Sequence, residues 1–193
     1  MDIVFPNGNE NEMVDMAKRL GTRSLLMLYP ADKRGETAPG ISVGTICAAS
    51  DVEKAMSKGG IVAMKSSDND RAVFESKNAP RLLIGVGENP VPDRMHQRET
   101  GLNQPLLREL KKNDVIVVLS LKSLLEREGV ARSELIGRWM ATIVLCRRAG
   151  VKMAIVSGAT TPWGMRAQAE LESVGVVLGM HPEEARKAVE SSI

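Results

Sequence analysis

The stretch from residue 151 to residue 180 constrains the fold of this chain more than any other segment. An apolar run from Lys152 to Val156 is followed by a turn of small residues, an amphipathic segment from Trp163 to Val174, and a second apolar run from Gly175 to Leu178. This order predicts strand, loop, helix and strand. Because such a crossover joins parallel strands, which helices cover on both faces, the stretch predicts a fully buried sheet.

Earlier apolar runs repeat the same unit. We expect strands at 3–5, 24–29, 41–48, 61–64, 82–86 and 115–119, with helices between most of them. The connection from Pro30 to Gly40 is an exception, because its 11 residues include two prolines and two glycines and leave little room for a helix. Ser133 is expected to cap the longest helix, which should end at Gly150 and bury Trp139 and Met140.

Eight short strands alternating with helices are typical of a parallel α/β protein, either a closed barrel or an open doubly wound sheet. We favour a (β/α) barrel of the TIM type, with a reduced helix after the second strand, because the units repeat evenly and reach eight. Residues 1–193 would form this single barrel domain. The composition, 43% hydrophobic and 26% charged, is that of a globular protein with one substantial core.

Composition also limits the classes of partner. The net charge of +2 does not by itself indicate a polyanion, and aromatic content of 3% argues against binding single strands by base stacking. No signal peptide or membrane-spanning apolar run is apparent, so no membrane contact is expected. Cys47 and Cys146 lie in separate apolar segments, which predicts buried free thiols and a cytoplasmic location.

Catalytic candidates are few. Sites in parallel α/β folds lie at the carboxyl ends of the strands. The residues expected at this edge are Asn7, Gly8, Tyr29, Ser50, Lys65, Ser66, Gly87, Glu88, Ser120, 157–161, Met180 and His181. They include no set of nucleophile, base and orienting group. The two histidines, His96 and His181, are too few for a histidine-rich metal site. We therefore predict no catalytic residue and no metal ligand.

Two weaker signals concern anions. Ser157, Gly158, Ala159 and Thr160 could cradle a phosphate, as loops after the last strands of barrels often do, although small residues also suit a sharp turn. Between Arg127 and Arg166 there are seven basic and two acidic residues. This excess is compatible either with a face that meets a polyanion or with an ordinary solvated helix surface.

Three segments resemble the protein component 3 family of archaeal ribonuclease P, which is related to the eukaryotic thirty-kilodalton subunit. They are SLKSLL (120–125), VSGATTPWGMRAQAELESVGVVLGM (156–180) and GLNQPLLRELKKNDV (101–115). In that family a serine and a basic residue follow strand six, a Ser-(Ser or Gly)-Ala turn follows strand seven, and a Gly-Val-Val-(Ile or Leu)-Gly-Met run comes before a helix. The resemblance extends from about Lys65 to the end and is topological before it.

The resemblance implies a barrel akin to the polymerase and histidinol phosphatase hydrolases, without their metal site. It implies a subunit of ribonuclease P, an endoribonuclease in which RNA catalyses removal of the 5′ leader from precursor tRNA, so the chain alone would not be catalytic. The expected partners are the ribonuclease P RNA, precursor tRNA and the ferredoxin-like protein component 2. The protein would bind no cofactor, whereas the RNA of the holoenzyme is expected to need Mg²⁺.

The family's basic residues correspond to Arg71, Arg98, Lys122 and Arg166. The resemblance implies that these side chains contact RNA phosphates and shape, since duplex RNA is recognised mainly in that way. Two alternatives stay open at this point. One is a phosphate-ester or sugar-phosphate enzyme that uses the loop from Ser157 to Thr161, and the other is a metal hydrolase of the related barrel superfamily.

Overall fold

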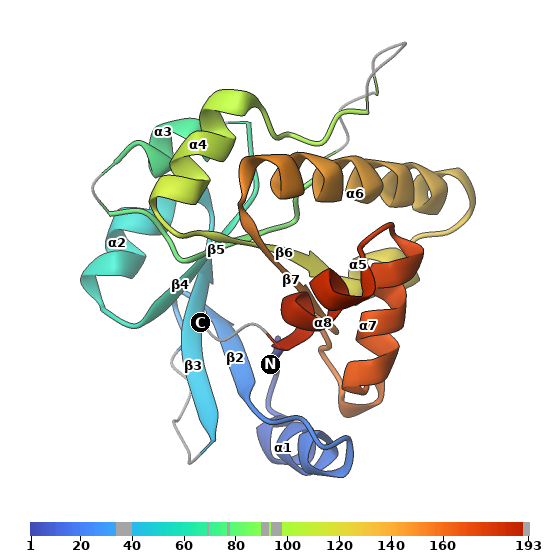
Figure 1. Cartoon of the computed structure of the whole chain (residues 1–193). Helices are drawn as coiled ribbons and strands as arrows, with labels where there is room; N and C mark the ends of the chain where they lie inside the picture. The colour runs from blue at the N-terminus through green and yellow to red at the C-terminus, as the bar shows by residue number, and fades with distance from the viewer. Residues whose placement is uncertain (34–39, 69, 77, 90–92, 94–97, 191–193) are drawn as a thin grey trace.

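The computed structural model describes residues 1–33, 40–68, 70–76, 78–89, 93 and 98–190. The strands within these residues form one parallel seven-stranded sheet that follows the order of the sequence. They are β1 (Asp2–Val4), β2 (Leu25–Pro30), β3 (Ile41–Cys47), β4 (Ile61–Lys65), β5 (Leu82–Ile84), β6 (Ile116–Ser120) and β7 (Lys152–Val156). The sheet curls into a nearly closed barrel with helices around it (Figure 1), which confirms the predicted TIM-like fold.

The helices connect successive strands and cover the barrel from outside. They are α1 (Glu10–Arg19), η1 (Ala49–Asp51), α2 (Val52–Ser57), α3 (Asp70–Phe74), α4 (Gln104–Lys112), α5 (Leu121–Leu125), α6 (Gly129–Ala149), η2 (Pro162–Gly164), α7 (Gln168–Val177) and α8 (Pro182–Glu190). Residues 34–39, within the connection where a reduced helix is predicted, lie outside the described residues. Among the described residues, no helix combines the length and the apolar character needed to cross a membrane.

Side chains of each strand alternate between the barrel interior and the surrounding helices. In β6, for example, Ile116 and Val118 belong to the interior cluster, whereas Val117 and Leu119 pack in the cluster shared with the helices. A strand buried on both faces needs apolar residues at nearly every position. This requirement explains why the strands appear in the sequence as continuous apolar runs rather than as alternating patterns.

The eighth strand, predicted at Gly175–Leu178, is wrong, because these residues continue helix α7 to Val177 and its C-cap Leu178. Leu171, Gly175 and Leu178 are buried on one helical face, while Val177 is exposed. A Cβ atom at Gly175 would lie 2.7 Å from Ile155 Cδ1 and 3.0 Å from Ala185 Cβ, so only glycine lets α7 approach β7 and α8 so closely. Tertiary packing thus overrides the β propensity of the valines.

The seam between the first and last strands is closed by a buried carboxylate. Asp2 accepts hydrogen bonds from Ser157 N (2.7 Å), Ser157 Oγ (2.6 Å) and Ile3 N (2.9 Å). Backbone bonds from Gly158 N to Ile3 O and from Phe5 N to Ala159 O continue the seam beyond β7. Burial raises the pKa of Asp2, because the hydrogen bonds only partly replace the lost water.

Helix α6 begins at Gly129, four residues before the predicted cap, and Ser133 donates instead to the carbonyl oxygen of Gly129 inside the helix. The predicted burial of Trp139 is confirmed, since 1% of the residue is exposed. Its indole nitrogen donates to Val86 O at 3.0 Å. Met140, predicted to point inward, is 44% exposed, so the buried face of α6 is narrower than its apolar pattern indicates.

Candidate nucleic-acid interface

A cavity of about 550 Å³ opens at the carboxyl ends of the strands, in the mouth of the barrel. Several residues predicted at this edge line it, namely Asn7, Lys65, Ser66, Glu88, Ser120, Gly158 and Thr160. Met180 and His181 are not among its lining residues. His181 instead lines a separate cavity with Gly150 and Val151, which precede β7, because no eighth strand carries the chain back to the carboxyl edge.

The predicted phosphate loop directs its amides into the protein. Ser157 N donates to Asp2, Gly158 N donates to Ile3 O, and Ala159 N donates to Ser157 Oγ at 3.3 Å. Thr160 O accepts from Asn9 Nδ2 at 2.9 Å. The geometry therefore does not favour a phosphate cradle on this loop, which serves to close the barrel seam.

Across the described part of the chain, no group of three or more histidine, cysteine, aspartate or glutamate side chains is placed to hold a metal ion. His96 lies outside the described residues. Cys47 and Cys146 are buried free thiols, as predicted, and burial raises the pKa of Cys146 to about 12.

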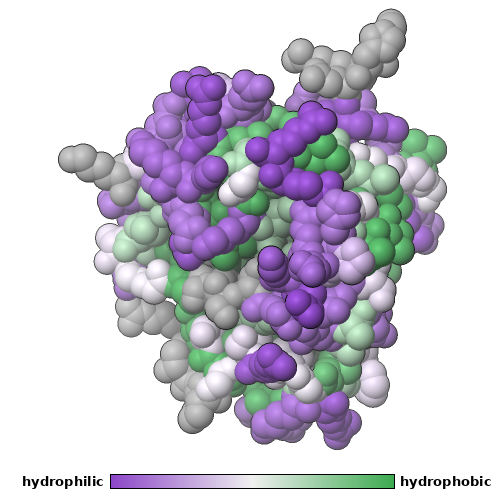
Figure 2. Space-filling view, viewed as in Figure 1, coloured by the Kyte–Doolittle hydropathy of each residue, from purple (hydrophilic) through white to green (hydrophobic). Residues whose placement is uncertain are grey.

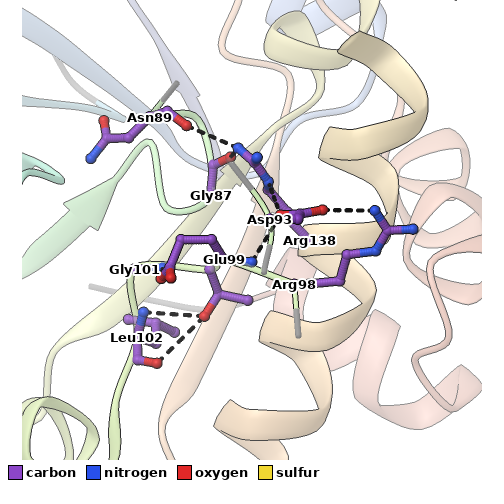
Figure 3. Close-up of polar contacts among 9 residues, drawn as sticks. Gly87, Asn89, Asp93, Arg98, Glu99, Gly101, Leu102 and Arg138 are labelled. Carbon is purple, nitrogen blue, oxygen red and sulfur yellow. Dashed lines mark hydrogen bonds and ion pairs between the residues drawn. The ribbon is translucent and has the colours of Figure 1, made fainter. Parts of the chain in front are cut away.

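The loop that precedes helix α4 is fastened to helix α6 by a carboxylate shared between two arginines (Figure 3). Arg138 of α6 donates through Nε to Asp93 Oδ1 at 2.9 Å, and Arg98 donates through Nη1 to Asp93 Oδ2 at 2.7 Å. The amide of Glu99 also donates to Asp93 at 2.9 Å. These three residues, Asp93, Arg98 and Arg138, form what we call the Asp93 cluster, which connects the chain ahead of α4 to α6.

The two arginines of the Asp93 cluster have different surroundings. Arg138 is buried, and its Nη1 donates to the carbonyl oxygens of Gly87 and Asn89 at 3.3 and 2.9 Å. The side chain of Arg98 is 53% exposed and lies across Gly137 of α6. Hydrogen bonds from Arg98 and Glu99, together with Arg138, lower the pKa of Asp93 to about 2. The carboxylate is therefore ionised at neutral pH and holds Arg98 at the surface.

The basic excess between Arg127 and Arg166 is largely neutralised in three dimensions. Four of its basic residues pair with acids from elsewhere in the chain: Arg127 with Glu88, Arg138 with Asp93, Arg147 with Glu184 and Lys152 with Asp114. Figure 2 shows hydrophilic residues over much of one face, interrupted by smaller apolar areas. The local count of basic residues therefore overstates the positive charge of this region.

The four predicted RNA-binding residues come from separate elements. Arg71 is in α3 and pairs with Glu75 at 2.6 Å; Arg98 belongs to the Asp93 cluster. Lys122, in α5, lines the barrel mouth and lies 3.3 Å from Glu126.

Arg166 lies at the other end of the barrel from Lys122. It lines a small cavity with Thr22 and Ser24, which precede β2, and it donates to the carbonyl oxygens of Trp163 and Met165. Because Lys122 and Arg166 line different cavities, at opposite ends of the barrel, the four residues do not form one compact cluster.

Sequence reasoning missed the residues that organise this region. It counted Arg138 only as surface charge and gave Asp93 no role. Lys33 lines the barrel mouth but follows a strand whose connection looked featureless. A signal was available for Arg138, since it directly precedes Trp139 and lies one turn after Leu135 on the buried face of the helix.

Comparisons with known proteins agree with this architecture. Residues 93–193, just over half of the chain, match the family model described as RNase P subunit p30. Ribonuclease P protein component 3 of Methanosarcina barkeri is 30% identical over 118 residues, which cover 59% of this chain and 48% of that protein. The protein of the same name from Methanosarcina acetivorans is 28% identical over 106 residues, covering 53% and 44%.

The chain spans about half the length of these curated relatives. A chain in the cryo-EM structure of archaeal Ribonuclease P with mature tRNA has a similar fold, with a TM-score of 0.77 and 16% identity, over 97% of this chain and 87% of that one. The matched segment contains α4, the Asp93 cluster and everything that follows them. On the strength of the family model, the chain belongs to the RNase P subunit p30 family.

Proposed function

We propose that this chain is a protein subunit of ribonuclease P that supports the RNA-catalysed removal of 5′ leaders from precursor tRNA. The observation that carries the proposal is the family match over residues 93–193. The likeness of fold to a chain of archaeal ribonuclease P supports it. In this role the protein supplies shape and positive charge, while the RNA, with Mg²⁺, performs the cleavage of the phosphodiester bond.

In the proposed role, Arg71, Arg98, Lys122 and Arg166 contact RNA phosphates. Arg98 is the strongest of the four, because Asp93 fixes its guanidinium while about half of the side chain stays exposed. A side chain held in place before binding loses less conformational entropy when it meets a phosphate. The partners are the ribonuclease P RNA, precursor tRNA and a ferredoxin-like subunit, in the cytoplasm.

A reconstitution experiment tests this function. The ribonuclease P RNA and the ferredoxin-like subunit from the same source would be combined with or without this chain, and release of the 5′ leader from precursor tRNA would be measured at limiting Mg²⁺. We expect the chain to raise the cleavage rate and to cleave nothing when incubated with precursor tRNA alone. An unchanged rate in the complete mixture would refute the proposal.

The RNA contacts have a separate test in the salt dependence of binding. Arg98→Glu should weaken RNA binding and reduce the slope of log affinity against log salt by about one, since each phosphate contact contributes close to one unit. Lys54→Glu, at an exposed position of α2 outside the proposed set, is the matched control for a change of two charges. Equal slopes for the two variants would show that Arg98 does not contact phosphate.

A further inference from the structure

The cavity in the barrel mouth has the dimensions and lining of a ligand site. Its volume of about 550 Å³ lies within the range of roughly 300–1,000 Å³ that is usual for small-molecule sites. Its deep wall is apolar, since Leu28 and Ile84 belong to the barrel interior and Ile46 packs against them. Phe5 also lines the cavity and is only partly buried, so part of an aromatic side chain is accessible there.

Three lysines surround this apolar wall. Lys65 ends β4, and its ammonium group has no ion-pair or hydrogen-bond partner among the described residues. Lys33 Nζ donates to the side-chain oxygen of Asn7 at 3.4 Å, and Lys122 Nζ lies 3.3 Å from Glu126 Oε1. The acids on the rim are Glu88, which pairs with Arg127, and Glu126. Within the described part of the chain, no acid forms an ion pair with Lys33 or Lys65.

The hydroxyl of Ser120 is open to the same cavity and is available to a ligand there. Ser120 is 5% exposed and lines the cavity, and its side-chain hydroxyl makes none of the hydrogen bonds found among the described residues. A Cβ atom at Gly158 would lie 1.8 Å from Ser120 Oγ, so the glycine keeps space open around the hydroxyl. The hydroxyl can therefore exchange water in the cavity for a hydrogen bond to a ligand.

From these features we infer that the barrel mouth binds a nucleoside monophosphate unit. The phosphate lies against Lys33 and Lys65, the base stacks on Phe5 over the apolar wall, and Ser120 hydrogen-bonds an edge of the nucleotide. Aromatic rings beside lysines are the usual means of holding an unpaired nucleotide. The unit is either free or extruded from an RNA strand, and the inference rests on the proposed function only for this second source.

Calorimetric titration of the purified full chain tests the inference without any ribonuclease P RNA. The probes are AMP, UMP, adenosine and inorganic phosphate, and a short RNA hairpin carrying one bulged nucleotide is compared with the same hairpin without the bulge. We expect AMP or UMP to bind at least tenfold more tightly than adenosine or phosphate if the site accepts free nucleotides. If it accepts only extruded nucleotides, the bulged hairpin should bind at least tenfold more tightly than its perfect duplex.

Variants locate the binding. Lys65→Gln and Ser120→Ala should each weaken binding of the preferred probe by threefold or more, whereas Lys54→Gln on α2 should leave it unchanged. Unchanged melting of the variants would show that the fold is intact. Preference for neither nucleotides nor the bulge, or binding that both cavity variants leave unaltered, would overturn the inference. Because no cleavage is measured, this result is independent of the reconstitution experiment.

Discussion

Two carboxylates hold distant parts of the molecule together by opposite means. Asp2 joins the first strand to the turn after the last strand, and it is buried among the neutral donors Ser157 and Ile3. Asp93 joins the loop before α4 to α6, and it binds two guanidinium groups near the surface. Burial raises the pKa of Asp2, whereas the hydrogen bonds of Arg98 and Glu99, with Arg138, lower that of Asp93 to about 2.

The difference shows that a hydrogen-bonded carboxylate is not stabilised in the same way at every place in a fold. Three neutral donors satisfy the oxygens of Asp2 but do not restore the hydration that the charge has lost. Hydrogen bonds from Arg98 and the Glu99 amide, together with Arg138, outweigh the desolvation of Asp93 and favour its charged form. Hydrogen bonds from neutral donors therefore hold the seam. Ion pairs hold the loop before α4 against α6, next to the buried side chain of Trp139.

Replacing Trp139, the buried residue next to Arg138 on α6, should have the largest effect on stability. Trp139→Ala removes a fully buried indole and its hydrogen bond to Val86 O, and we expect a loss of about 3–5 kcal/mol in the free energy of unfolding. Met140→Ala, at the exposed neighbouring position, should change it by less than about 0.5 kcal/mol. Urea denaturation of both variants measures the contrast, and a similar loss in both would show that stability does not depend on the indole.

The seam should respond next. Asp2→Ala leaves the amides of Ser157 and Ile3 and the hydroxyl of Ser157 without an acceptor, which should cost about 2–4 kcal/mol of unfolding free energy. Asp2→Asn keeps an oxygen for the two amides and carries no charge, so its loss should be clearly smaller. Denaturation at pH 7 compares them. Equal losses in the two variants would mean that the charge, rather than the hydrogen bonds, holds the seam.

The pH dependence of stability should have opposite signs at the two carboxylates. A raised pKa in the folded state makes the contribution of Asp2 largest at low pH and reduces it as the pH rises above about 3.8 towards the raised value. The lowered pKa of Asp93 gives a contribution that is present above about 3.8 and is lost as the pH falls through about 2.

Unfolding free energies from pH 3 to pH 7 for the wild type, Asp2→Asn and Asp93→Asn measure these signs. The wild type should lose stability relative to Asp2→Asn as the pH rises, and gain stability relative to Asp93→Asn over the lower part of the same range. Slopes of the same sign for the two pairs would contradict the contrast between a buried carboxylate and one paired with arginines.

Features that depend on local sequence patterns were predictable, whereas those that depend on contacts between distant residues were not. Strands β1–β7 and the burial of Trp139 were predictable, because a strand covered on both faces and the centre of a long helix leave strong local patterns. The helical conformation at Gly175 was not predictable, because it depends on close packing against Ile155 and Ala185, which are separated from it in the sequence. The roles of Asp2 and Asp93 were hidden too, because a single acid beside a strand or in a loop resembles any solvated residue.

The smallest effect on stability is expected for an exposed ion pair within one helix, the pair between Arg71 and Glu75. Arg71 and Glu75 lie 2.6 Å apart on α3, but both side chains are about half exposed, so water and salt screen the attraction. Arg71→Gln should therefore change the free energy of unfolding by less than about 0.5 kcal/mol. Arg138→Gln should cost several times more, because Arg138 is buried and its loss leaves the carbonyl oxygens of Gly87 and Asn89 short of a donor. Denaturation of the two variants side by side decides whether burial sets the strength of these arginine contacts, since equal losses would mean that pairing alone does.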